Sequence, residues 1–284
     1  MGRESPYAAA MEDPKPETET PAPMAPLSKA VPEQLPDVPA APLPAAHAAG
    51  SDAAKWRFPP VHPEGLRIGG IMAAVALLAF LFGWWPVGWL LAAFAAFTAT
   101  FFRDPVRASP GGAGLIISPA DGLVSQIMEV ELPRQVQGDG GLAPGRALRI
   151  SIFMSVFDVH INRSPIAGTV SRLAYVPGSF LNADLDKASE ENERQYFVIT
   201  GTDGTMVAFT QIAGLIARRI IGFVREGTMV AAGQRIGLIR FGSRVDIFLP
   251  AGYQPQVVKG QRAVAGETVL AARGVAAAVP GALQ

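Results

Sequence analysis

The sequence predicts a mainly β (α+β) protein, in which a β-rich domain with lipoyl-like hairpins follows a two-helix transmembrane hairpin and a disordered N-terminal tail. Three observations predict this order. The first 50 residues hold 11 of the 25 prolines, residues 68–102 form a run of 35 residues without a charge, and short β-branched runs separated by Gly, Pro and Asp fill the rest. A proline-rich segment of low complexity is typical of a disordered tail, a long apolar run of membrane helices, and regularly spaced short strands of a β domain.

Residues 1–65 are rich in Pro and Ala and poor in aromatic and β-branched residues, so we expect a disordered tail that has too little apolar surface for a core. The whole chain has 24 basic and 24 acidic residues, and this balance argues against a nucleic-acid-binding protein. The absence of cysteine excludes disulfides, thiolate metal sites and a cysteine nucleophile. We expect no metal site.

Residues 66–102 are predicted to form two membrane helices, Leu66–Phe82 and Val87–Phe102, because 35 uncharged residues are too many for one straight pass. Gly83, Pro86 and Gly88 break the run near its middle, beside two interfacial tryptophans. Basic residues flank both ends, which predicts that both ends face the cytoplasm at the inner membrane. A signal peptide and a buried hydrophobic hairpin of a soluble protein are the alternatives.

Residues 103–284 are predicted to form an antiparallel β domain. Residues 202–205 fit a hairpin turn, and a helix is expected at Ser189–Gln195 or Ile216–Ile221. Two glycine-punctuated repeats, residues 227–239 and 257–271, resemble lipoyl-type half-barrels, although two simple β-hairpins explain them equally well. The predicted strands are Gly114–Ile117, Ala147–Phe153, Thr169–Val176, Tyr196–Thr200, Thr205–Ile212 and Val245–Leu249.

Three residues of this domain could form a catalytic set. His160 is the only histidine after the membrane segment, Asp121 lies in a tight turn, and Ser243 follows Gly242. An acid, an imidazole and a hydroxyl can act as orienting group, base and nucleophile. A glycine before a serine leaves the peptide carbonyl uncrowded for attack by the hydroxyl, whereas no G-x-S-x-G elbow indicates a hydrolase.

Four motifs carry a resemblance to a known family: Asp158–Pro165, Gly178–Arg194, Gln211–Ile220 and Phe241–Asp246. In this order, within about residues 103–250, they resemble the short, membrane-anchored bacterial branch of the phosphatidylserine decarboxylase proenzymes. The hydrophobic hairpin that precedes them is similar to that branch too.

The resemblance implies a pyruvoyl-dependent enzyme that makes its own prosthetic group. Ser243 would attack the carbonyl of Gly242, and the chain would separate into a β chain, residues 1–242, and an α chain, residues 243–284, that begins with pyruvate. Asp121 would orient His160, and His160 would activate Ser243. The pyruvoyl group would then form a Schiff base with phosphatidylserine and release CO₂, giving phosphatidylethanolamine without an external cofactor.

The resemblance further implies a phospholipid substrate, a lipid bilayer and a homodimer as partners. Two alternatives remain, a non-enzymatic membrane-anchored adaptor or carrier with lipoyl-like hairpins and a conventional serine hydrolase whose chain stays intact. Polar and basic residues in the motifs are candidates for binding the substrate head group, since arginine binds phosphate through paired hydrogen bonds. These candidates are Arg163, Asn182, Lys187, Asn192, Arg194, Arg218 and Arg219.

Overall fold

The computed structural model describes residues 58–179, 191–214, 219–240 and 242–279. These residues all belong to one compact unit, Gln34–Gln284. The predicted tail lies outside the described residues up to position 57.

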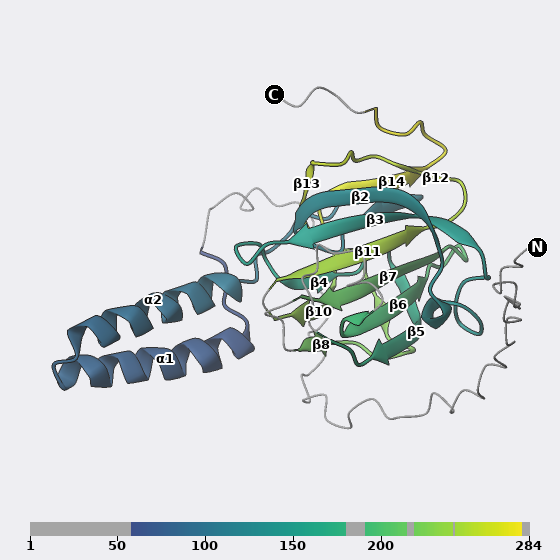
Figure 1. The fold of residues 1–284 in the computed structure, drawn as a ribbon. Helices are drawn as coiled ribbons and strands as arrows, with labels where there is room; N and C mark the ends of the chain where they lie inside the picture. Colours follow the sequence, from purple (N-terminus) through teal and green to yellow (C-terminus); the bar gives the residue numbers. More distant parts are fainter. Residues whose placement is uncertain (1–57, 180–190, 215–218, 241, 280–284) are drawn as a thin grey trace, which may run out of the picture. The chain divides into compact units, whose positions relative to one another are not determined.

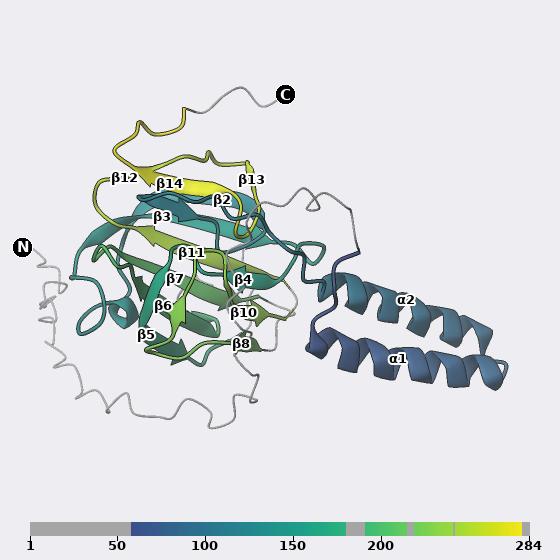
Figure 2. The same cartoon turned by 180° about the vertical axis from the view of Figure 1, so that it is seen from behind.

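The two predicted helices are present, as α1 (Pro63–Leu81) and α2 (Trp85–Phe101), and they lie side by side as an antiparallel hairpin (Figures 1 and 2). His62 caps α1, since its Nδ1 accepts a hydrogen bond from the amide of Glu64. Gly83, with φ of 74°, makes the turn between the helices. A Cβ atom at Gly88 would lie 2.5 Å from the ring of Phe80, so glycine permits this close helix contact.

In the described part of the β domain, the strands form three antiparallel sheets (Figure 1). The largest has the strand order β13-β2-β3-β11-β7-β6-β5-β9, and the smaller ones have the orders β1-β14-β12 and β4-β10-β8. The first seven strands are β1 (Leu115–Ile117), β2 (Gly122–Glu131), β3 (Arg146–Met154), β4 (Ile161–Arg163), β5 (Gly168–Val176), β6 (Arg194–Thr200) and β7 (Met206–Ala213). The others are β8 (Ile220–Gly222), β9 (Met229–Val230), β10 (Arg235–Ile239), β11 (Ser243–Leu249), β12 (Tyr253–Pro255), β13 (Arg262–Ala263) and β14 (Val269–Arg273). A short helical turn, η1 (Arg134–Val136), follows β2.

All six predicted strands are confirmed within one or two residues, and the turn at residues 202–205 joins β6 to β7 as expected. Of the helix expected at Ser189–Gln195 or Ile216–Ile221, Glu191 is helical, but the prediction is wrong at the ends of both ranges. Arg194–Gln195 belong to β6 and Ile220–Ile221 to β8. β6 is hydrogen-bonded on both sides, to β5 and to β7. These bonds satisfy the backbone N–H and C=O groups that would be bonded within the segment if it were a helix.

The two glycine-punctuated repeats are not simple hairpins, because the strands within each repeat do not pair with each other. β9 pairs with β5, while β10 pairs with β4 and β8. β13 pairs with β2, while β14 pairs with β1 and β12. Each repeat therefore runs from the largest sheet into one of the two smaller sheets.

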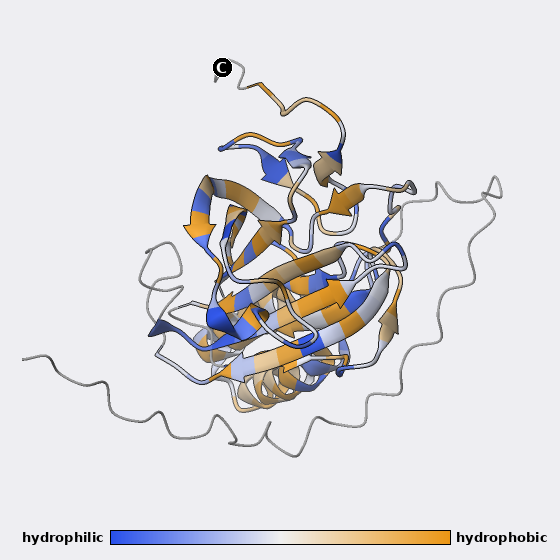
Figure 3. Ribbon diagram, turned by 90° about the vertical axis from the view of Figure 1, so that its right-hand side faces the viewer, coloured by the Kyte–Doolittle hydropathy of each residue, from blue (hydrophilic) through white to orange (hydrophobic). Residues whose placement is uncertain are grey.

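The central strand β11 is buried along its whole length, although it alternates between apolar and charged residues. Ser243, Val245 and Ile247 share one face of the sheet, and Arg244 and Asp246 lie on the other. The first face carries the main core, which includes Ile150, Ile152, Phe197, Phe209, Val245 and Ile247. Figure 3 shows the mixture of hydrophobic and hydrophilic residues along the strands.

Candidate active site

Ser243 is the first residue of β11, at the end of the sheet where β3 and β7 also end. It pairs with Met154 on one side and Ala213 on the other. Its side chain is buried, and Oγ donates to the Met154 Sδ at 3.3 Å. Because a thioether is a weak acceptor, this contact leaves the hydroxyl available to a stronger base.

Gly242 presents its carbonyl to a backbone donor. Its φ of 66° lies in the left-handed region, which glycine adopts without steric cost. The amide of Gly214 donates to the Gly242 carbonyl oxygen at 3.0 Å. A fixed N–H donor at this oxygen polarises the carbonyl and can stabilise negative charge that develops there.

His160 lies beside the same peptide. Its Nε2 is 3.2 Å from the amide nitrogen of Gly242, and its Nδ1 is 3.0 Å from the carbonyl oxygen of Asp158. A carbonyl can only accept, so Nδ1 carries the proton and Nε2 presents its lone pair to Gly242. Burial lowers the pKa of His160 from 6.5 to about 4. The imidazole is therefore neutral at pH 7, as a general base must be.

Asp121 lies in the turn before β2 and has other partners than His160 in the described chain. Oδ2 accepts from Arg107 Nη2 at 2.7 Å, and Oδ1 accepts from the amide of Ala265 at 2.7 Å. Burial raises the pKa of Asp121, although the charge of Arg107 opposes this shift. The described hydrogen-bond partner of His160 Nδ1 is the Asp158 carbonyl oxygen.

Sequence reasoning missed three contributors, Asp158, Gly214 and Arg107. Asp158 accepts from the amide of Ser155 at 2.8 Å and pairs with Arg262. Its position two residues before His160, in a motif already recognised, was an available signal. Gly214 contributes its backbone amide, which nearly every residue type has, so the sequence gives no signal for it.

The guanidinium of Arg163 makes hydrogen bonds and an ion pair within the protein. Its guanidinium donates to the carbonyls of Gly233 and Pro105 at 2.9 and 2.8 Å and pairs with Asp104 at 3.3 Å. Burial lowers the pKa of Arg163 to about 10. Asn192 is also buried, and its side-chain amide donates to the carbonyl of Ala213 at 2.7 Å.

Arg194 differs from these two residues. Its side chain is 7% exposed, and Nε and Nη1 have no hydrogen-bond partner among the residues that the structure describes. Arg194 pairs with Ile212 on β7, and Ile212 pairs with Arg244 on β11, so the two arginines lie on one face of the sheet. Arg219 is exposed. Asn182, Lys187 and Arg218 lie outside the described residues.

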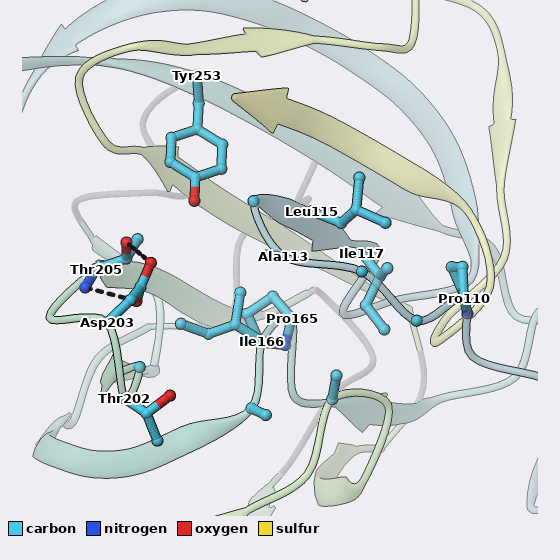
Figure 4. Close-up of a pocket in the computed structure, with 16 residues that line it drawn as sticks. Pro110, Ala113, Leu115, Ile117, Pro165, Ile166, Thr202, Asp203, Thr205 and Tyr253 are labelled. Carbon is cyan, nitrogen blue, oxygen red and sulfur yellow. Dashed lines mark hydrogen bonds between the residues drawn. The ribbon is translucent and has the colours of Figure 1, made fainter. Parts of the chain in front are cut away.

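A separate cavity of about 370 Å³ lies between β1, β12 and the β6–β7 turn (Figure 4). Tyr253 points toward Thr205 and Asp203 across it. Its lining includes neither His160 nor Ser243. The cavity is therefore distinct from the Gly242–Ser243 peptide.

The site therefore brings a neutral imidazole and a serine hydroxyl to the two ends of one Gly-Ser segment in a β domain, a base and a nucleophile beside a backbone carbonyl. Comparisons with known proteins identify the family. Residues 94–271 match the family model "Phosphatidylserine decarboxylase". The chain belongs to the phosphatidylserine decarboxylase family, whose members are carboxy-lyases.

Curated relatives are named "Phosphatidylserine decarboxylase proenzyme". The protein of Erythrobacter litoralis is 58% identical over 227 residues, which cover 78% of this chain and 91% of the relative. That of Novosphingobium aromaticivorans is 54% identical, with 82% and 94% covered, and that of Zymomonas mobilis is 53% identical, with 76% and 88% covered.

Proposed function

We propose that this chain cleaves itself between Gly242 and Ser243 to form a pyruvoyl group, and that the mature enzyme decarboxylates phosphatidylserine to phosphatidylethanolamine. Family membership supports the reaction. The observation that carries the self-cleavage is the neutral imidazole of His160, whose Nε2 lies 3.2 Å from the amide of the glycine that precedes Ser243.

The cleavage follows from the groups around this peptide. His160 Nε2 exchanges its contact with the Gly242 amide for the Ser243 hydroxyl and takes its proton. Oγ then attacks the Gly242 carbonyl carbon while the Gly214 amide stabilises the oxyanion, and the C–N bond breaks to give an ester. Loss of the Ser243 α-proton expels the Gly242 carboxylate and leaves dehydroalanine. Hydrolysis of dehydroalanine releases ammonia and leaves the pyruvoyl group.

The residues present fit this prosthetic group, because a Gly-Ser peptide with a buried serine, a neutral base and an N–H donor at the carbonyl are all in place. When formed, the pyruvoyl group supplies an electron sink for the pair left by departing CO₂. His160 can hold a proton at Nε2 and return it to the α-carbon. The role implied for Asp121, orientation of His160, stays a prediction, since its described partners are Arg107 and Ala265.

The α chain would remain bound after cleavage. Residues 243–284 contribute β11–β14, and β11 is hydrogen-bonded between β3 and β7 of the β chain. β13 and β14 likewise pair with β2 and β1. These ladders hold the new N-terminus at the end of the sheet. The homodimer stays a prediction.

We assign Arg194 to the substrate phosphate. A buried guanidinium with two unpartnered nitrogens is stabilised by an anion, and phosphate accepts paired hydrogen bonds. Arg194 lies two strands from β11, about 10 Å between backbones at the usual strand spacing. The Arg194 side chain lies on the face of the sheet that carries Arg244, opposite to Ser243, so the head group would reach it around the end of the sheet where β6 and β11 begin.

The helical hairpin is assigned to the membrane. α1 is long and apolar enough to span a bilayer, and α2 is a shorter apolar helix. Many of its large hydrophobic side chains are exposed, an unusual surface for a soluble protein. They include Leu66, Ile71, Leu78, Leu81, Phe82, Trp84, Trp85, Trp89 and Leu90. Arg67, near the start of α1, and Arg103, just after α2, bound the uncharged run, so both ends and the catalytic domain would face the cytoplasm.

The test is the intact mass of the detergent-solubilised full chain beside Ser243→Ala and a matched control, Ser151→Ala. Ser151 is a buried serine on the neighbouring strand β3, and its hydroxyl has no described partner. We expect wild type and the control to yield residues 243–284 with a ketone in place of the N-terminal amine, and Ser243→Ala to stay intact. An uncut wild-type chain that still decarboxylates phosphatidylserine would refute the mechanism. An uncut chain without activity would favour the adaptor.

A further inference from the structure

The base of the helical hairpin touches the catalytic imidazole. Phe101, the last residue of α2, stacks on His160 with ring centroids 4.2 Å apart and an interplanar angle of 28°. Both side chains are buried, with 1% and 2% exposure. The segment assigned to the membrane therefore ends against the group assigned to proton transfer.

The packing around this stack joins the two parts of the chain. Phe101 and Phe102 belong to one hydrophobic cluster with Val159 and Ile161, the residues on either side of His160. Phe97, one turn earlier in α2, contacts the Phe101 ring and meets Phe157 edge to face. The backbone and the ring of His160 thus rest on the same end of α2.

Two polar contacts hold the neighbouring loops. Arg103, just after α2, donates to the carbonyl of Phe157 at 2.7 Å, three residues before His160. Glu64, in the first turn of α1, pairs with Arg240, two residues before Gly242. The hairpin base therefore fixes both the loop that carries the base and the segment that leads to the scissile peptide.

We infer that Phe101 is a positioning residue for His160, so that the docked base of the helical hairpin is part of the self-cleavage site. This inference rests on the proposed self-cleavage. An aromatic ring against one face of the imidazole limits its rotation and excludes water from it. Nε2 is then held toward Gly242 while Nδ1 stays on the Asp158 carbonyl.

The stack also contributes to the burial that keeps His160 neutral. The charged groups that act on the imidazole are Asp158, which favours the protonated form, and Arg103, which opposes it. Removal of the Phe101 ring admits water and weakens desolvation, so the pKa of His160 rises toward its ordinary value.

The experiment compares self-cleavage of the full chain in detergent for wild type, Phe101→Leu and Phe101→Tyr. Phe94→Leu, a half-exposed phenylalanine of α2, is the matched control. We expect Phe101→Leu to slow cleavage at pH 7.5 by about tenfold to a hundredfold, the effect of misplacing a reacting group by about 1 Å. Phe101→Tyr keeps the ring and restores most of the rate, and Phe94→Leu cleaves like wild type.

A second readout separates positioning from loss of structure. The pKa of His160 is measured by NMR in the uncleaved Ser243→Ala protein with labelled histidine, since the chain has only three. We expect a value near 4 that rises by at least about one unit with Phe101→Leu, in a protein of unchanged circular dichroism. Cleavage at the wild-type rate, or slower cleavage with an unmoved His160 pKa, overturns the inference. If wild type itself stays uncut, the proposed function fails while the NMR comparison still decides the role of Phe101.

Discussion

The Nε2 atom of His160 faces the backbone amide of Gly242 at 3.2 Å, and the hydroxyl of Ser243 lies on Met154. The base is thus one residue away from the proton that it must remove. For self-cleavage, the Ser243 hydroxyl must leave Met154 and reach Nε2. Apo geometry of this kind is common, since catalytic hydrogen bonds often tighten only as the reaction proceeds.

The first prediction concerns the pH dependence of self-cleavage. The base must be unprotonated, and burial lowers the pKa of His160 to about 4. The cleavage rate of the folded chain should therefore stay level from pH 8 to about 5 and fall as the pH approaches 4. An ordinary histidine would lose half its activity near pH 6.5. Time courses of cleavage on denaturing gels measure the fall of the rate at acid pH. A midpoint near pH 6.5 would contradict the assignment of the buried His160 as the base.

The same lowered pKa has a consequence for stability. The unfolded chain binds a proton at His160 near pH 6.5, whereas the folded chain binds it only near pH 4. Stability should therefore fall as the pH drops through this window, by about 3 kcal/mol in total. Denaturant unfolding of Ser243→Ala measures the loss. The matched control is the double variant Ser243→Ala, His160→Gln. Its unfolding free energy should depend much less on pH over this window.

A second prediction addresses Asp121. The structure pairs it with Arg107, so Asp121→Asn and Arg107→Gln should each slow cleavage by about tenfold or more, and the double variant should be no slower than the worse single one. This non-additivity marks one shared interaction. If Arg107→Gln is silent while Asp121→Asn loses about 10⁴-fold, the carboxylate acts on His160 directly, as in a triad.

The sequence was sufficient for the strands that alternate or run apolar, because β-branched runs such as the one in β3 mark buried strands whatever their partners. It was insufficient for β2, in which Gln126 and Glu129 interrupt the pattern. It also mistook residues near Arg194 for helix. Strand partners far apart in sequence, such as β9 with β5, decide these cases.

The site shows the same division. Residue type alone marked His160, Gly242 and Ser243 as candidates, His160 and Ser243 by their side chains and Gly242 by its uncrowded carbonyl. The Asp158 carbonyl and the Gly214 amide act through backbone atoms, which residue identity does not reveal. The stack of Phe101 on His160 joins the apolar helix α2 to a β domain, and no local pattern encodes that contact.

A third prediction concerns the charged face of β11. Asp246 accepts two hydrogen bonds from Arg244, both at 2.9 Å, and all three groups of the Arg149–Asp246–Arg244 set are at least nine-tenths buried. Asp246→Asn leaves buried positive charge without its carboxylate, so we expect a loss of about 3–5 kcal/mol in unfolding free energy. Denaturant unfolding in the Ser243→Ala background measures it. Glu131→Gln, which breaks an exposed pair with Arg146, is the control and should change stability little. Equal effects would contradict the burial argument.

The last prediction tests Arg194 as the phosphate ligand. Arg194→Gln should raise KM for phosphatidylserine by about tenfold to a hundredfold, the worth of a hydrogen bond to a charged group, with kcat little changed and self-cleavage intact. Arg194→Lys should recover part of the affinity because it retains the charge without the paired donors. The control Arg225→Gln changes an exposed arginine and should leave KM unaltered.

Stability separates this role from a structural one. Two nitrogens of Arg194 are buried without a described partner, so their desolvation opposes folding. Replacing the charge by the neutral amide of Arg194→Gln should leave the unfolding free energy unchanged or raise it, even as substrate binding weakens. This combination is expected of a residue that binds substrate but lowers the stability of the protein without substrate. A structural arginine would show the reverse, a less stable protein with an unchanged KM, and that outcome would remove Arg194 from the site.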